Sequence, residues 1–129
     1  MNNFIYLSGK MTGLDPKEYT KQFELAETIA KKWFHVESDQ IINPVNYGDL
    51  SYTWNDNMKE AVKVMMLCDK MILLPNFYKS KGAMVELNFA IKLGYEIYLL
   101  DTPNSYNLIK IKNKKWFYFI NYLKGLRKR

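Results

Sequence analysis

A single glutamate is the side chain best placed for chemistry in this sequence. Glu86 lies in the second turn of an apolar-periodic helix that is expected to begin at Ser80, directly after the buried-strand pattern of residues 69–74. Open α/β sheets bind ligands outside the carboxyl ends of their strands, which is where such a helix begins. Ser80 and the free N–H groups after it would meet an anion or a sugar at the helix N-terminus. The spacing therefore predicts an anion or sugar held near a lone carboxylate.

Strand and helix patterns alternate along the chain. The runs typical of buried strands lie at residues 3–7, 40–43, 69–74 and 95–100. The helical periodicities lie at residues 15–34, 54–67 and 80–93. Residues 106–111 fit either a short strand or a helical turn. This order predicts one α/β domain of the flavodoxin or Rossmann-like type, with a parallel sheet of four to five strands and helices on both faces.

The loops that follow the strands should meet at one edge of that sheet. They bring four residues towards Glu86, namely Ser8, Gly9, Asn43 and Ser80. Trp54, at the start of the second helix, is either a core anchor or a lid over a ring. No His, Cys and Asp cluster has the spacing of metal ligands, so neither a metal nor a cofactor is expected.

The net positive charge of the chain comes from its C-terminal end. The net charge is +6, yet residues 110–129 hold eight Lys and Arg and no acid, whereas residues 1–109 hold 11 basic and 13 acidic side chains. We expect residues 1–112 to form the domain. Residues 113–129 are expected to form a basic, aromatic helix packed on the domain or on a partner subunit. A nucleic-acid or membrane contact is the less favoured alternative.

Other features favour a cytoplasmic protein. The N-terminus shows no signal-peptide pattern, and no apolar run is long enough to span a bilayer. Cys68 is the only cysteine, so no internal disulfide can form. We therefore expect a cytoplasmic chain that needs no membrane contact.

Four short motifs resemble the nucleoside 2-deoxyribosyltransferase superfamily, and most closely an uncharacterised phage and prophage branch of it. In order along the chain they are Ile5-Tyr6-Leu7-Ser8-Gly9-Lys10-Met11-Thr12-Gly13, Asn43-Pro44, Cys68-Asp69 and Ser80-Lys81-Gly82-Ala83-Met84-Val85-Glu86. The resemblance covers residues 4 to about 100. It implies cleavage or transfer at an N-glycosidic bond, with Glu86 as the nucleophile that forms a glycosyl-enzyme ester.

The resemblance also assigns substrate contacts. Ser80 matches a serine that holds a 5′-phosphate, and Gly82 lies in the same motif. Ser8 and Gly9 would add backbone N–H groups and a hydroxyl, and Lys10, which replaces the proline usual in the closest branch, would add positive charge. Asn43 either fixes its own loop or contacts the ligand, and Tyr6 either contacts Glu86 or packs in the core.

The partners implied are a small nucleotide and further copies of the chain, because superfamily members form dimers or larger oligomers that complete each other's sites. The phage-like branch suggests a role in nucleotide metabolism in the host cytoplasm. A nucleic-acid partner is less favoured.

One departure from the superfamily concerns the proton donor. Catalytic members carry an aspartate eight residues before the Asp that opens the third strand, but the matching residue here is Ala61. Glu60 could substitute, or Asp56 or Asp69 could reach the base. Alternatively, the protein binds a nucleotide without cleaving it, and so sequesters or senses it.

Overall fold

The computed structural model of the chain describes residues 4–47, 53–101 and 107–112. Within these ranges a single sheet has the strand order β2-β1-β3-β4-β5. Its strands are β1 (Phe4–Ser8), β2 (Ile41–Ile42), β3 (Cys68–Leu73), β4 (Glu96–Leu100) and β5 (Leu108–Lys110). The first four are parallel, and β5 runs antiparallel to β4. The predicted α/β domain is confirmed, and the ambiguous segment at 106–111 contains a strand.

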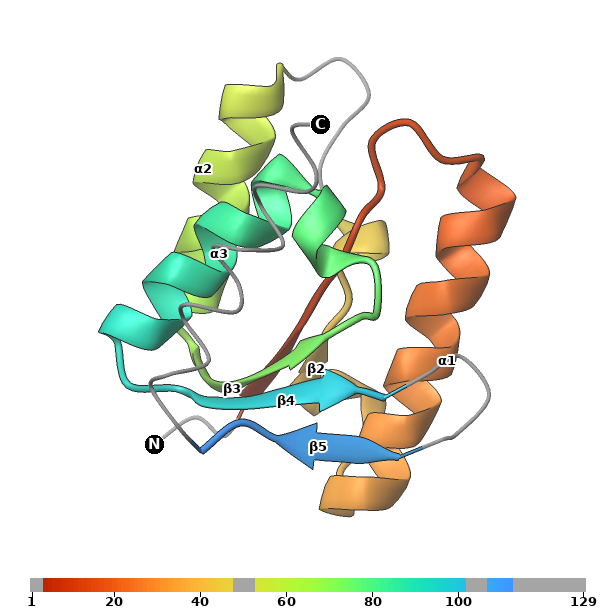
Figure 1. The fold of residues 1–129 in the computed structure, drawn as a ribbon, viewed down its shortest axis with the longest axis vertical. Helices are drawn as coiled ribbons and strands as arrows, with labels where there is room; N and C mark the ends of the chain where they lie inside the picture. Colours follow the sequence, from red (N-terminus) through yellow and green to blue (C-terminus); the bar gives the residue numbers. More distant parts are fainter. Residues whose placement is uncertain (1–3, 48–52, 102–106, 113–129) are drawn as a thin grey trace.

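Helices cover both faces of the sheet, as the alternating pattern predicts. The α-helices of the described residues are α1 (Pro16–Phe34), α2 (Trp54–Met65) and α3 (Lys81–Lys92). Figure 1 shows α1 on one face and α2 with α3 on the other. Short 3₁₀ turns lie at η1 (Ser38–Gln40), η2 (Pro44–Asn46) and η3 (Phe77–Lys79). The fold is a Rossmann-like single domain.

The side chains of β1 alternate between the two layers, as strand geometry requires. Ile5 and Leu7 belong to the core beneath α1, together with Phe23 of that helix. Tyr6 belongs to the core beneath α2 and α3, together with Leu87. Because successive side chains alternate, Ser8 points to the same face as Tyr6. That face therefore carries two hydroxyl groups towards α3.

Side-chain caps fix where the helices begin. The Asp15 carboxylate accepts from the Lys17 N–H at 2.9 Å at the start of α1. The Ser80 hydroxyl accepts from the Ala83 N–H at 3.1 Å and so begins α3. Both starts agree with the sequence-based expectation.

The end of α2 differs from the expectation of a helix to residue 67. The helix ends at Met65, because the chain then enters β3, where Cys68 already pairs with Phe4. The expected helix at residues 113–129, and hence the role assigned to the basic end, lies outside the described residues. Within the described ranges, no helix combines the length and the apolarity needed to cross a bilayer.

Candidate functional site

Glu86 is a buried carboxyl group held by two hydroxyls from one strand. Its side chain is 7% exposed. The Tyr6 hydroxyl donates to Oε2 at 2.6 Å, and the Ser8 hydroxyl donates to Oε1 at 2.7 Å. Because Tyr6 and Ser8 are two apart on β1, strand alternation places both donors on the same face of the sheet, and the packing of α3 on that face brings them to the carboxyl. Each carboxyl oxygen is thus fixed by its own donor.

Burial controls the ionisation of this group. Removal from water raises the pKa of Glu86 to about 7, although the hydrogen bonds from Tyr6 and Ser8 act in the opposite direction. Burial and the neighbouring Glu86 charge also raise the pKa of Tyr6 well above its usual value. Tyr6 therefore stays protonated and remains a donor at neutral pH. The carboxyl is able to change its charge in the physiological range.

The loop after β1 is locked against the end of β3. The Leu74 N–H donates to the Ser8 carbonyl at 2.8 Å, and the Lys10 N–H donates to Asn76 Oδ1 at 3.2 Å. A Cβ atom on Gly9 would lie only 2.8 Å from Leu74 Cβ. This close approach requires glycine, which explains why Gly9 stands at the carboxyl end of β1.

A cleft of about 1220 Å³ opens beside Glu86. Its walls come from the loop after β1, from η2, from α2 and from the N-terminus of α3. Tyr6 and Glu86 line it from the sheet side, and Ala61 and Val64 line it from α2. A cleft of this size exceeds the range of roughly 300–1,000 Å³ usual for small-molecule sites. It therefore has ample room for a small-molecule ligand.

Of the described residues, three lysines line the cleft, one from the loop after β1 and two beside the start of α3. Lys10, Lys79 and Lys81 line it, together with Ser80 and Gly82. The first N–H groups of a helix precede its first intrahelical hydrogen bonds and carry the positive end of the dipole. Together with the lysines they make this part of the cleft suitable for an anion.

Gly82 allows α2 and α3 to approach each other at the cleft. A Cβ atom at this position would lie 3.2 Å from Met58 Sδ and 3.8 Å from Trp54 Nε1. The ring of Trp54 lines the cleft and is 37% exposed, and Lys81 Nζ lies 4.1 Å from its centroid. Trp54 therefore lies in the wall of the cleft and is not a core anchor, whereas a role as a lid stays a prediction.

The structure brings together most of the residues singled out from the sequence, some in the lining of the cleft and others buried behind it. Tyr6, Gly9, Lys10, Ser80, Gly82 and Glu86 line the cleft. Ser8 is completely buried and contacts the cleft only through Glu86. Asn43 is also buried, does not line the cleft, and accepts from the Val45 N–H at 3.1 Å. Its side chain therefore fixes the turn after β2.

The three acids considered as proton donors differ in position. Asp56 forms a capping box with Thr53 and does not line the cleft. Asp69 lies near the amino end of β3, away from the carboxyl edge, and pairs with Lys70 at 3.4 Å. Only Glu60 lines the cleft, where it is half-exposed and pairs with Lys63 at 3.6 Å.

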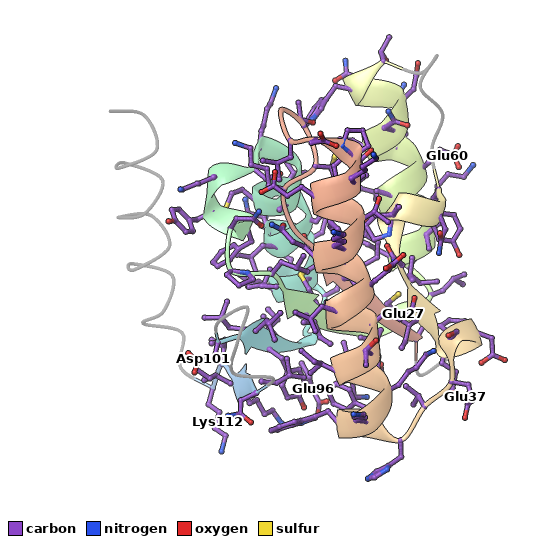
Figure 2. The ribbon with its side chains drawn as sticks, turned by 90° about the vertical axis from the view of Figure 1, so that its right-hand side faces the viewer. Glu27, Glu37, Glu60, Glu96, Asp101 and Lys112 are labelled. Atoms are coloured by element: carbon purple, nitrogen blue, oxygen red, sulfur yellow. The ribbon has the colours of Figure 1, made fainter. Side chains whose placement is uncertain are left out.

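Figure 2 shows Glu60 and Glu96 towards opposite ends of the molecule. Glu60 lies on α2 towards the top of the view, whereas Glu96, which pairs with Lys70, lies towards the bottom. Asp69 pairs with the same lysine. Asp69 therefore belongs to an ion-pair group with Lys70 and Glu96 near the amino ends of β3 and β4, opposite the carboxyl ends where the cleft lies.

Sequence reasoning did not select several cleft residues. Lys79 and Lys81 flank Ser80, so their spacing around the helix start was an available signal. Tyr19 and Tyr47 add aromatic rings from α1 and from the turn after β2. No periodicity distinguishes these rings from core aromatics.

Among the residues that the structure describes, no group of three His, Cys, Asp or Glu side chains is placed to hold a metal ion. Burial raises the pKa of the Cys68 thiol to about 12, so this group stays protonated. Among the described residues, the lining of the cleft supplies the carboxyl groups of Glu86 and Glu60, hydroxyl groups, lysines and aromatic rings.

Comparison with known proteins identifies a family without an assigned activity. The DUF4406 family, described as a domain of unknown function, matches residues 3–99. No curated protein and no solved structure matches the chain. The matched segment extends from β1 almost to the end of β4 and contains Tyr6, Ser8 and Glu86. Since this match spans most of the sequence, the chain belongs to the DUF4406 family.

Proposed function

We propose that the protein cleaves or transfers the N-glycosidic bond of a (deoxy)nucleoside 5′-monophosphate, with Glu86 as the nucleophile. The observation that carries this proposal is the Glu86 carboxyl, buried beside the cleft with one hydroxyl donor on each oxygen. A carboxylate in such a site is protected from bulk water and held in one orientation. These are the properties that an attacking group needs.

The lysines and the beginning of α3 support a phosphorylated ligand. Lys10, Lys79 and Lys81 line the same cleft as Glu86. Helix N-termini bind phosphate through free N–H groups and the helix dipole. The hydroxyl of Ser80, which caps α3, would add to such a contact. A sugar 5′-phosphate at this point would leave C1′ free to approach the carboxylate.

The proposed reaction divides one difficult step into two. Glu86 attacks C1′, an ester bond forms, and the bond between C1′ and the base breaks through an oxocarbenium-like transition state. Water or a second base then attacks C1′ and releases the carboxylate. Tyr6 and Ser8 favour the ionised form of Glu86, because both donate hydrogen bonds to it.

A second candidate is a protein that binds a nucleotide without cleaving it. The observation in its favour is the α2 wall of the cleft, where Met58, Ala61 and Val64 are apolar. A normal base must receive a proton to depart easily, and the one carboxyl group that α2 is described to bring to the cleft, that of Glu60, is half-exposed and paired with Lys63. In this candidate function the cleft would sequester or sense the nucleotide. A homo-oligomeric state and a place in phage nucleotide metabolism stay predictions under both candidates.

The proposal is tested by incubating the protein with each (deoxy)nucleoside monophosphate and measuring the released base by chromatography. The wild-type protein should release base, and Glu86→Gln should abolish release, because the amide keeps the size of the carboxyl but cannot attack C1′. Glu24→Gln is the matched control, since Glu24 is exposed on α1. Tight nucleotide binding without release of base, equal in wild type and Glu86→Gln, would favour the binding function instead.

A further inference from the structure

The cleft contains only one buried carboxyl group among the described residues. Glycoside-cleaving sites usually pair a nucleophile with a second carboxylic acid that protonates the leaving group. Here the second carboxyl that lines the cleft belongs to Glu60, which is half-exposed and paired with Lys63 at 3.6 Å. The Tyr6 hydroxyl donates to Glu86 itself, and the lysines line the part of the cleft suited to phosphate. Among the described residues, the cleft therefore offers a buried carboxyl for attack but no buried acid to donate a proton.

The need for a proton donor depends on the leaving group. A neutral purine or pyrimidine leaves as an anion unless its ring is protonated, and general acid catalysis contributes about 10²–10⁴-fold to such steps. A ring whose glycosidic nitrogen already carries a positive charge leaves as a neutral molecule. Such a substrate requires a carboxylate on the sugar side and no acid on the base side.

The cleft already holds a cation against an aromatic ring. Lys81 Nζ lies 4.1 Å from the centroid of Trp54, within the range of a cation–π contact. Trp54 lines the cleft from the N-terminus of α2, and Tyr19 and Tyr47 line it as well. A flat cationic ring would gain the same attraction as the lysine, together with stacking area.

We propose that the preferred substrate is a nucleotide whose glycosidic nitrogen is quaternary, such as a pyridinium nucleotide, with the cationic ring against Trp54, the phosphate at the lysines and Glu86 facing C1′. This proposal rests on the proposed function and narrows its substrate class. The negative Glu86 and the positive ring have complementary charges, and the phosphate balances the lysines. The apolar side chains that α2 contributes to the cleft, Met58, Ala61 and Val64, then suit a leaving group that departs uncharged.

The reaction balances without a further reactant except water. Glu86 forms an ester bond to C1′ while the bond between C1′ and the ring nitrogen breaks, and that electron pair stays on the ring, which becomes neutral. Water then attacks C1′, releases the carboxylate and yields ribose 5-phosphate. The proton lost by the water passes to solvent. No oxidant or reductant takes part.

Nicotinamide mononucleotide is the probe for the wild-type protein, with AMP and dAMP as neutral-base comparisons and the reduced form of nicotinamide mononucleotide as the uncharged-ring control. Nicotinamide release should exceed adenine release by at least about 10²-fold in kcat/KM, the lower end of what a general acid contributes. The reduced form should release no base, and Glu86→Gln should remove the nicotinamide release.

A pair of variants tests the cause of the preference. Ala61→Asp places a carboxyl in the α2 wall, and Ala61→Asn has the same shape but is not an acid. The aspartate should raise the ratio of adenine release to nicotinamide release at least about tenfold over the asparagine variant, below the full range of general acid catalysis. Equal ratios in the two variants would overturn the assigned cause.

The results also separate this inference from the proposed function. Release of base from AMP or dAMP at a rate equal to or above that from the pyridinium nucleotide would overturn the inference and leave the proposed function standing. Absence of release from every nucleotide would overturn both.

Discussion

The Ser8 hydroxyl lies 2.7 Å from Oε1 of Glu86, although 78 residues separate them in the sequence. This contact joins the end of β1 to the second turn of α3. Because Ser8 is completely buried, the hydroxyl serves the carboxyl and not the ligand directly. Ser8 is thus a positioning residue for the proposed nucleophile, and its removal should change both the orientation and the ionisation of Glu86.

Ser8→Ala should move the acid limb of the pH–rate profile to higher pH. The hydrogen bond from Ser8 lowers the pKa of Glu86, which burial raises to about 7. A hydrogen bond to a charged group contributes about 1.5–3 kcal/mol, so its loss should raise the pKa by roughly one to two units. The profile of kcat/KM for base release measures the shift, because it reports the free enzyme. Ser38→Ala, on an exposed 3₁₀ turn, is the matched control. An unmoved limb in Ser8→Ala would show that this hydroxyl does not control Glu86.

Glu86 should also make the stability of the fold depend on pH. Its folded pKa of about 7 lies above the ordinary glutamate value of 4.5, so the folded state binds more protons between these values. The contribution of Glu86 to the free energy of unfolding is therefore most favourable below about pH 4.5 and is lost as the pH rises through 7. The shift corresponds to about 3 kcal/mol. Glu86→Gln should gain stability relative to wild type on going from pH 5 to pH 8, as measured by urea unfolding. A constant difference between the two proteins across this range would contradict the assignment.

Gly9→Ala should disturb the loop that lines the cleft. The new Cβ atom would lie 2.8 Å from Leu74 Cβ, and such overpacking costs about 1–3 kcal/mol in the free energy of unfolding. The variant should also bind phosphate more weakly, because Lys10 follows directly in the chain. Gly13→Ala is the comparison. Gly13 has a φ of 86° but open space around its Cβ position, so only backbone strain is added there. Calorimetric titration with inorganic phosphate measures the difference, and equal affinity in both variants would argue against a role for the Gly9 turn.

The sequence predicts the position of Glu86 well because two periodicities determine it. Apolar spacing places α3, and the strand pattern before it places the carboxyl end of β3 beside that helix. The same reasoning could not assign the partner of Ser8. Alternation fixes the face of β1 on which Ser8 lies, but the hydrogen-bond partner depends on how closely α3 packs on the sheet.

Asn43 and Trp54 illustrate the same limit. Asn43 was open to a ligand contact or a loop contact, and its side chain accepts from Val45 N–H at 3.1 Å. Which of the two contacts forms depends on the rotamer of the Asn43 side chain in a tight turn. The contact between Trp54 and Lys81 depends on the approach of α2 to α3 at Gly82. No local pattern encodes such a distance between two helices.

The lysines of the cleft should distinguish a nucleotide from a nucleoside. Lys79→Gln and Lys10→Gln each remove one charge from the part of the cleft proposed for phosphate. Each should weaken AMP binding by roughly three- to thirtyfold, since a hydrogen bond that involves a charged group contributes up to about 2 kcal/mol under partial exposure. Adenosine binding should change little, because adenosine carries no phosphate. Lys32→Gln, exposed on α1, is the matched control. Titration of both ligands at low and at raised salt measures the effect, because screening weakens only the charged contact. Equal losses for AMP and adenosine would place the phosphate elsewhere and would leave the lysines as ordinary surface charges at the mouth of the cleft.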